Sequence, residues 1–315
     1  MYRHLLVTVD GAPGGIDAIG HALELARAVG ARVTFLLAGA APASRLSGAR
    51  LPEHGAKVEA AARAQGLSHV IAGAGHPGAG LPGAGDAAPA ALAAELGCDL
   101  IGVAALPHDA DAAACAQRRH LLATSGVPVL VCTSRRTPAE ARVMARCLDA
   151  HRAVGELLHA LMAFGVDADV DVDAQQQRQA SDAQRALASL AALQRARVGT
   201  AAEAQLFAAL RVRAECVAAE LDELDRQRQR DAQALDALER IAADGLPSAA
   251  FDAALARYAR GAFEQMGRME GVIFPAARRY LGDADWAGLD DPLADGAAAT
   301  PPGMNEPDDA RRASD

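Results

Sequence analysis

The chain has 315 residues, of which 51% are hydrophobic and only 3% aromatic, and its formal net charge is −9 at pH 7. This length predicts two domains, and the acidic balance argues against binding to a nucleic-acid backbone, which requires a basic face. Five scattered cysteines without a C-x-x-C pair are typical of reduced thiols in the cytosol. The start does not read as a secretory signal, and no apolar run approaches the ~20 residues of a membrane-spanning helix. We therefore expect a cytoplasmic protein that binds neither nucleic acid nor membrane.

Strand-like and helix-like segments alternate over the first 135 residues, which we assign to one α/β domain. Five short apolar runs are the predicted strands, at residues 4–10, 31–37, 67–72, 99–103 and 127–132. Helical patterns separate them, and Gly30 is expected to end the first long helix. Such alternation predicts a Rossmann-like, five-stranded parallel sheet with right-handed crossovers. The first run ends in an acid, Asp10, as is typical of a buried parallel strand.

Five pieces of this region, in this order, resemble the universal stress protein family: Leu5–Gly11, His21–Ala26, Gly30–Val33, Gly97–Gly102 and Val127–Cys132. The resemblance spans nearly all of residues 1–133. It implies a nucleotide cleft that includes Asp10, and a homodimer that pairs through the last strand, Val127–Cys132.

ATP-binding members of that family carry G-x2-G-x9-G-[ST] after the fourth strand. Those glycines let the backbone approach the phosphates, and the last one opens a helix whose N-terminus receives them. The corresponding segment Ala104–Cys115 contains no glycine and places Asp109 and Asp111 where phosphate charge would gather. We expect the nucleotide site to be largely lost, with residual ATP binding as the alternative.

A second glycine motif, Gly78–Gly83, fits G-x-G-x-x-G between a strand and a helix. However, Pro82 removes an amide donor, and the motif lies in a Gly/Ala/Pro tract that would match by chance. A long loop is the simpler interpretation.

A capping box, Thr137-Pro138-Ala139-Glu140, predicts that a new helix begins after the first domain. We assign residues 136–142 to a linker, 143–290 to a second domain, and 291–315, which lack aromatic residues, to a disordered tail. Four long segments of the second domain have helical apolar spacing, at residues 138–164, 174–212, 217–238 and 251–272. This spacing predicts an antiparallel four-helix bundle. The acidic loop 167–173 lacks the glycine of a calcium loop at its sixth position, Val172.

Polar residues interrupt the apolar stripes of the last two segments. Arg228 and Asp231 lie in the third stripe and Gln265 lies in the fourth, so all three are expected to point inward. A polar group in a core stripe requires a partner there.

Two stretches of the second domain resemble hemerythrin-like (HHE cation-binding) domains: Glu203–Phe207, and Gln265–Ala277 with its Ile-Phe-Pro-Ala-Ala piece. That family holds two irons with histidines from four helices and two bridging carboxylates. By position, the resemblance implies His151 as a metal ligand and Glu203 and Glu270 as the carboxylates. The other expected histidines are replaced by Gly199, Arg228 and Gln265, so the domain is a degenerate member.

We hypothesise that Arg228 substitutes for the metal. Its guanidinium, which stays protonated even in a protein core, would lie between Glu203 and Glu270 and close to His151. Two alternatives stay open. In one, Arg228 reaches solvent and the glutamates lie on wet faces; in the other, His151, Glu203 and Glu270 hold one metal ion, such as iron.

These features predict a non-catalytic stress-response or regulatory protein that acts through contacts with an unknown protein partner and needs no cofactor. The alternatives are a hemerythrin-like metal or oxygen sensor with an altered mononuclear site, or a protein with residual ATP binding. A hydrolase or transferase is not favoured, because the sequence shows neither a Ser-His-Asp order nor a nucleophile elbow.

Overall fold

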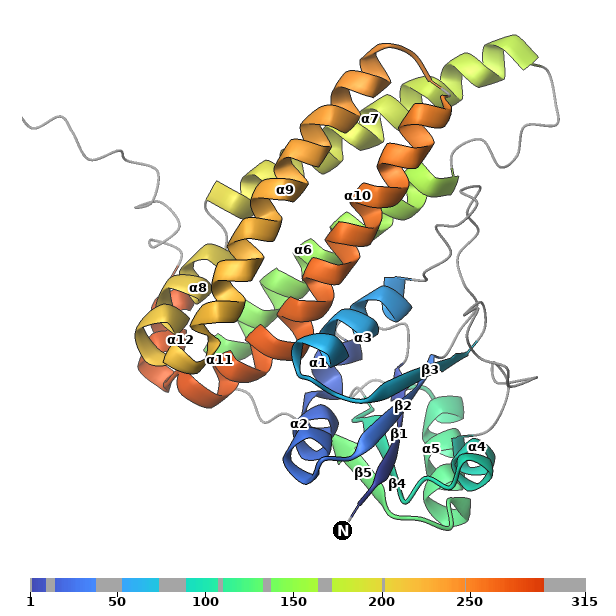
Figure 1. Cartoon of the computed structure of the whole chain (residues 1–315), viewed down its shortest axis with the longest axis vertical. Coiled ribbons are helices and arrows are strands. Elements are labelled where there is room, and N and C mark those ends of the chain that lie inside the picture. Colours follow the sequence, from blue (N-terminus) through green and yellow to red (C-terminus); the bar gives the residue numbers. More distant parts are fainter. Residues whose placement is uncertain are drawn as a thin grey trace, which may run out of the picture.

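The computed structural model describes residues 2–9, 15–37, 53–73, 89–106, 110–132, 137–163, 172–199, 202–246 and 248–291. An α/β region lies against a helix-rich C-terminal region (Figure 1). Several predicted features lie outside the described residues: Asp10, Asp109, the Gly78–Gly83 motif, most of the acidic loop and the tail from residue 292 onward.

A five-stranded parallel sheet forms the centre of the α/β region, as predicted. Its strands are β1 (His4–Val9), β2 (Arg32–Leu37), β3 (His69–Gly73), β4 (Leu100–Ala104) and β5 (Val129–Cys132). The spatial order is β3-β2-β1-β4-β5, and every neighbouring pair is parallel. The order reverses between β1 and β4, so the carboxyl ends of these two strands flank the switch point of the sheet.

Helices cover both faces of the sheet, which explains why its strands are apolar on both sides. The helices of this region are α1 (Gly15–Ala18), α2 (Gly20–Val29), α3 (Glu53–Ala64), α4 (Pro89–Leu96) and α5 (Ala112–Thr124). Leu5 and Val7 of β1 share a core with Leu23 of α2 and Val58 of α3, whereas Leu6 lies in a core that includes residues of α4 and α5. Gly30 ends α2 in the left-handed conformation, with φ of 67°, as predicted.

The C-terminal region consists of helices and short helical turns. They are α6 (Pro138–Ala163), α7 (Val172–Gly199), α8 (Ala202–Arg213), a 3₁₀ turn (Glu215–Val217), α9 (Ala218–Ala243), α10 (Ala249–Arg268), a π-helical turn (Met269–Ile273), α11 (Phe274–Tyr280) and α12 (Asp283–Asp290). Thr137 Oγ1 accepts a hydrogen bond of 3.2 Å from the Glu140 amide, which confirms the predicted helix start. That start lies inside the range 136–142 that we assigned to the linker.

One helix prediction was wrong. The single segment predicted over residues 174–212 is two helices, α7 and α8. Gly199, which ends α7, explains the break, since glycine is about 1 kcal/mol less favourable than alanine inside a helix.

Helices α6, α7, α9 and α10 surround a common apolar core. Helix α6 contacts α7 and α10, and α9 also contacts α7 and α10. Leu158, Leu190, Leu238 and Phe263, one from each helix, belong to one buried cluster. None of the described helices is both long enough and apolar enough to cross a bilayer.

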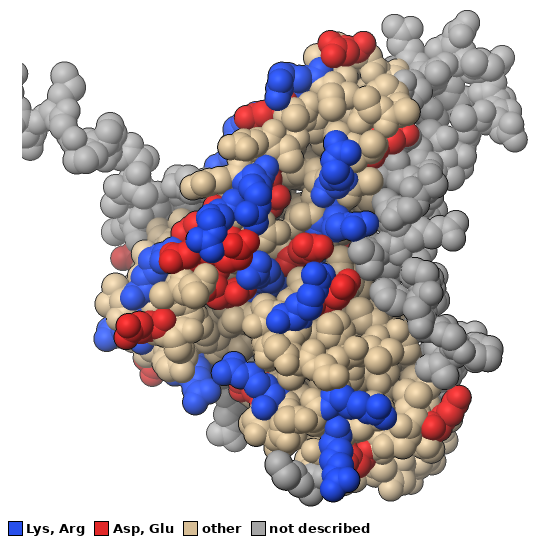
Figure 2. Space-filling view, viewed as in Figure 1, with Lys and Arg blue, Asp and Glu red and all other residues tan. Residues whose placement is uncertain are grey.

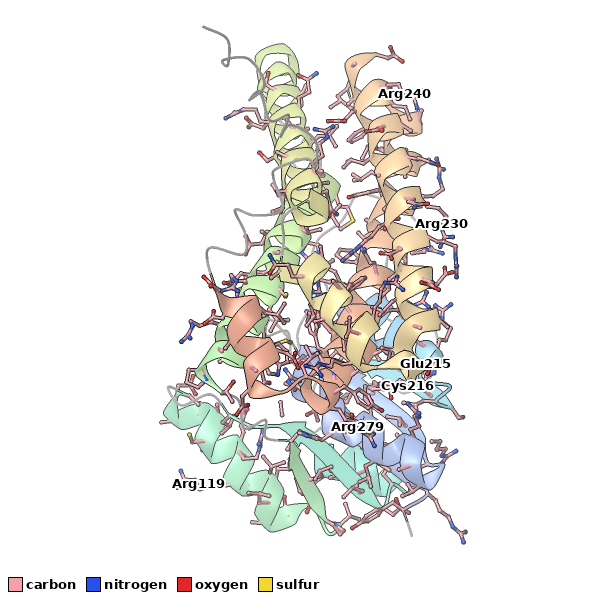
Figure 3. The ribbon with its side chains drawn as sticks, turned by 90° about the vertical axis from the view of Figure 1, so that its left-hand side faces the viewer. Arg119, Glu215, Cys216, Arg230, Arg240 and Arg279 are labelled. Carbon is pink, nitrogen blue, oxygen red and sulfur yellow. The ribbon has the colours of Figure 1, made fainter. Side chains whose placement is uncertain are left out.

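The outer face of α9 is densely charged. Acidic and basic side chains alternate over the helical region in Figure 2, and Figure 3 shows Arg230 and Arg240 along the outer side of α9. Glu223, for example, pairs with both Arg226 and Arg230 at 2.8 Å. Exposed pairs of this kind contribute little to stability, typically ~0.2–1 kcal/mol each.

Candidate functional site

Helix α3 lies against α10 and the π-helical turn (Figure 1) because two glycines leave room for it. A Cβ at Gly267 would lie 2.2 Å from the Lys57 carbonyl oxygen, and a Cβ at Gly271 would lie 2.3 Å from the Cβ of Ala61. The glycines are four residues apart, as are Lys57 and Ala61, so the close contacts follow one face of each helix. This packing brings the Lys57 side chain of the α/β region to the helical region.

The π-helical turn has a second contact with the α/β region. Pro275 has no N–H and cannot donate to the carbonyl four residues earlier, that of Gly271. The side-chain Nε2 of Gln65, just after α3, donates to this carbonyl instead. A π turn carries one extra residue within a helix and is frequent at functional sites; here it includes Glu270.

Glu270 and Lys57 form a buried ion pair between the two regions. Lys57 Nζ lies 3.0 Å from Glu270 Oε1 and 2.7 Å from Glu53 Oε1. His151 Nδ1 of α6 lies 3.0 Å from the same Glu270 oxygen. The side chains of Lys57, Glu270 and His151 are each less than a tenth exposed.

Further polar contacts lie on the other side of His151. Its Nε2 lies 3.3 Å from Glu203 Oε1, and Glu203 Oε2 accepts a hydrogen bond of 2.8 Å from Arg228. The Arg228 guanidinium carbon lies 4.1 Å from the centre of the Phe207 ring, within range for a cation–π contact. We call the whole chain of contacts the charge network: Glu53, Lys57, Glu270, His151, Glu203 and Arg228.

Electrostatics keep the carboxyl of Glu270 ionised. Burial raises its pKa, but the charge of Lys57 and the hydrogen bond from His151 outweigh burial and bring the pKa to about 2. Burial lowers the pKa of Lys57, yet the charges of Glu270 and Glu53 overcome this and raise it above its usual value. Lys57 and Glu270 are therefore both charged at neutral pH.

The structure brings four of the predicted residues together: His151, Glu203, Glu270 and Arg228. The hypothesis about Arg228 is only partly correct, because its guanidinium contacts Glu203 whereas the cation beside Glu270 is Lys57. Arg228 retains 13% exposure of its side chain, while its neighbour Gln227 is more deeply buried. Gln265 is buried as expected, with 4% exposure.

The residues implied as metal ligands do not fit a metal in this arrangement. His151, Glu203 and Glu270 face one another, but each carboxylate already contacts a basic side chain, Lys57 or Arg228. Among the described residues, no group of three or more His, Cys, Asp or Glu side chains has a geometry that could hold a metal ion. A divalent cation at Glu270 would meet the fixed charge of Lys57.

A second buried cation links the two regions. Arg278 of α11 donates to Asp17 Oδ2 of α1 at 2.7 Å and to Glu140 Oε1 of α6 at 3.1 Å. Burial lowers the pKa of Arg278, but its bonds with Asp17 and Glu140 raise it overall. Lys57 and Arg278 thus each contact one acid of the α/β region and one acid of the helical region.

The end of the sheet that would hold a nucleotide is described only in part. Asp111 caps α5: its Oδ1 accepts a hydrogen bond of 2.7 Å from the Ala114 amide. A helix N-terminus is a natural phosphate site, and here a carboxylate takes one of its amides. The predicted loss of phosphate affinity stays a prediction, and the position of Asp10 lies outside the described part of the chain.

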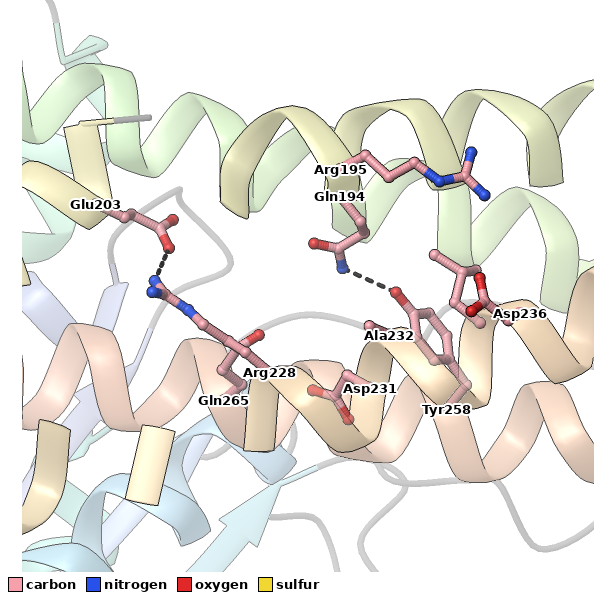
Figure 4. A pocket seen from close by; sticks show the side chains of 10 residues that line it. Gln194, Arg195, Glu203, Arg228, Asp231, Ala232, Asp236, Tyr258 and Gln265 are labelled. Carbon is pink, nitrogen blue, oxygen red and sulfur yellow. Dashed lines mark hydrogen bonds and ion pairs between the residues drawn. The ribbon is translucent and has the colours of Figure 1, made fainter. Parts of the chain in front are cut away.

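A cavity of about 260 Å³ adjoins the charge network between α7, α8, α9 and α10 (Figure 4). Arg228 and Gln265 both line it. Asp231 and Tyr258 also line it, and Tyr258 is only 2% exposed. Gln194 donates a hydrogen bond of 2.8 Å to the Tyr258 hydroxyl across one end (Figure 4).

Comparison with known proteins concerns the N-terminal part. Residues 1–110 match the profile of the Universal stress protein family. The N-terminal part of the chain contains a universal stress protein domain. This domain supplies Lys57, Glu53 and Asp17 to the contacts described above. The search of curated proteins found no match.

Two solved structures are similar to this domain. One is a protein from the universal stress protein family from Burkholderia pseudomallei, with 22% identity over 41% of this chain and 95% of its own, and a TM-score of 0.28. The other is a universal stress protein in complex with cAMP, with 22% identity over 42% of this chain and 99% of its own, and a TM-score of 0.30.

Sequence reasoning did not identify Lys57 or Glu53 as members of the site. A signal exists in the sequence, because Lys57 lies in a run of small residues, Gly55–Ala56 before it and Ala60–Ala62 after it. Small residues on both sides indicate a closely packed helix, in which a lysine needs a buried acid. The acid is Glu270, more than two hundred residues away in the sequence.

Proposed function

We propose that the protein is a non-catalytic stress-response or regulatory protein that acts through protein contacts in the cytoplasm. Its universal stress protein domain is joined to a degenerate hemerythrin-like domain, in which α6, α7 with α8, α9 and α10 make an antiparallel four-helix bundle. In this proposal the nucleotide and di-iron sites have lost the residues that would hold a nucleotide or iron, and they bind neither.

The observation that carries the proposal is the Lys57–Glu270 pair. A hemerythrin-like core would place a metal beside this carboxylate, and here a lysine from the other domain contacts it at 3.0 Å. A core whose acids are neutralised by the protein's own cations needs no metal, and its stability depends on domain contact instead. This arrangement therefore favours a function in binding between proteins or domains rather than in catalysis.

The experiment is metal analysis and native mass spectrometry of the purified full chain, together with equilibrium dialysis against ATP. We expect substoichiometric iron, no ATP binding, and no near-ultraviolet or visible band of an oxo-bridged di-iron centre. One equivalent of metal would instead support the sensor alternative with a mononuclear site at His151, Glu203 and Glu270. Saturable ATP binding would support the residual nucleotide site.

We also propose a homodimer through β5. This strand is an edge of the sheet, and Val129, Leu130 and Val131 are only partly buried. An edge strand presents unpaired backbone groups and is a ready template for pairing with a second chain. Native mass spectrometry of the same sample tests this, since a monomer at micromolar concentration would contradict it.

A further inference from the structure

His159 of α6 lies beside the charge network, where α6 meets α3 and α10. The centre of its ring lies 5.8 Å from the centre of the Phe263 ring of α10, and its Nε2 lies 3.6 Å from Glu53 Oε2 of α3. Gly155, one turn earlier on α6, leaves room for this carboxylate, because a Cβ there would lie 2.9 Å from Glu53 Oε2. Helices from both regions therefore enclose His159, and the α/β region contributes α3.

The ring nitrogen that faces Glu53 has no hydrogen bond. His159 Nε2 is a buried atom without a hydrogen-bond partner among the residues that the structure describes. A distance of 3.6 Å is too long for a hydrogen bond. The other oxygen of Glu53, Oε1, already lies 2.7 Å from Lys57 Nζ. A proton on His159 would therefore gain little from Glu53, whose charge Lys57 already balances.

The surroundings of His159 oppose its protonation. The titratable groups that act on it are Glu53, His54 and Lys57, all of α3. Helix α10 presents the uncharged ring of Phe263. Burial lowers the pKa of His159, the charge of Glu53 raises it, and the charges of His54 and Lys57 lower it again, so the pKa lies below its usual 6.5. His159 is therefore neutral at pH 7 while α3 is docked.

Separation of α3 from α6 and α10 would return His159 to water and make its protonation easier. The separated state binds the proton near pH 6.5, whereas the docked state binds it only at lower pH. The contribution of neutral His159 to docking is therefore complete above about pH 6.5 and is lost as the pH falls from there to the pKa of the docked state. Each unit of difference between the two pKa values changes the docking equilibrium about tenfold.

We propose that His159 is a proton sensor of domain docking. Its protonation weakens the packing of α3 on α6 and α10, and so loosens the universal stress protein domain from the helical region in mild acid.

The test is backbone hydrogen exchange of the full chain at about pH 7 and about pH 5.5, corrected for the intrinsic pH dependence of exchange. We expect the protection of the α3 amides to fall about threefold or more on acidification. Helix α3 has 12 residues, and an isolated helix of this length is marginal in water, so it frays once it leaves its packing. Helix α5, which packs on the other face of the sheet, should keep its protection.

Two variants attribute the effect to His159. His159→Gln keeps a polar side chain that does not titrate, and should abolish the pH dependence of α3 protection. His120→Gln is the matched control, because His120 is exposed on α5, and it should behave as the parent does. His4 of β1 also has a lowered pKa, through burial and the charge of Arg32, but any effect of His4 would persist in both variants.

NMR titration of the His159 ring in the parent gives a readout that does not depend on the folding of a variant. Titration at or above pH 6.5 overturns the proposal, and so does α3 protection that is the same at both pH values. An equal loss of α3 protection in His159→Gln also overturns it. These measurements use metal-free and nucleotide-free protein, so metal or ATP binding, which would contradict the proposed function, leaves their outcome unchanged.

Discussion

Removing the charge of Lys57 is the most direct perturbation of the charge network. In Lys57→Met the aliphatic stem is kept and the ammonium is lost, so Glu270 remains buried and, within the described part of the chain, keeps its contact with His151. Breaking a buried ion pair from one side typically costs 3–5 kcal/mol, because the remaining charge is unpaired. The depression of the Glu270 pKa from its usual 4.5 to about 2 corresponds to about 3 kcal/mol, which is of the same order.

The pH dependence of the loss provides a second readout. A carboxyl whose folded pKa is depressed contributes stability that is complete above its unfolded pKa and is lost as the pH falls through the folded pKa. In the parent, the contribution of Glu270 is therefore complete above about pH 5 and declines between that pH and about pH 2. The difference between parent and Lys57→Met should be constant from pH 7 to about pH 5 and should narrow below it.

The assay is urea unfolding followed by circular dichroism at pH 7, 5 and 4. Arg63→Met is the matched control on the same helix, because Arg63 and its partner Glu59 are 57% and 35% exposed, so its loss should stay below ~1 kcal/mol. The double variant Lys57→Met/Glu270→Gln should recover part of the stability, since no buried charge is then left unpaired. If Lys57→Met is no less stable than Arg63→Met, or if its deficit grows in acid, the reasoning is refuted.

Two further predictions concern packing and capping. Gly267→Ala should destabilise the protein by roughly 1–3 kcal/mol in thermal unfolding, because the new Cβ would meet the Lys57 backbone. The control Gly288→Ala should cause no loss, because nothing lies within 4 Å of its Cβ. Equal effects of the two substitutions would contradict the close approach of α3 to α10. Asp111→Ala should cost about 1 kcal/mol in urea unfolding, since the Ala114 amide loses its acceptor, and an unchanged midpoint would show that the cap contributes nothing.

Local patterns in the sequence predicted most of the secondary structure, and long-range contacts account for what was missed. The apolar run ending at Val9 and the capping box at Thr137 depend on neighbours in the chain, so the strand and the helix start could be recognised. Arg228 was expected to contact Glu270 because the resemblance to hemerythrin-like domains assigns both positions to one metal site. Lys57, which lies in a different domain, contacts Glu270 instead of Arg228. No periodicity within either domain predicts this contact.

Helix α3 belongs to the cores on both sides of the predicted linker, residues 136–142. Ala56 of α3 belongs to the core of the helical region, while Val58 and Ala61 of the same helix belong to the core of the sheet. Helix α3 is thus shared, and separating the regions would expose Gly267 and Gly271 and leave Glu270 without its cation. A metal would neutralise Glu270 whether or not the domains touched, but Lys57 does so only when they are docked. The pairing of Glu270 with Lys57 therefore makes the electrostatic balance of the helical core depend on contact with the universal stress protein domain.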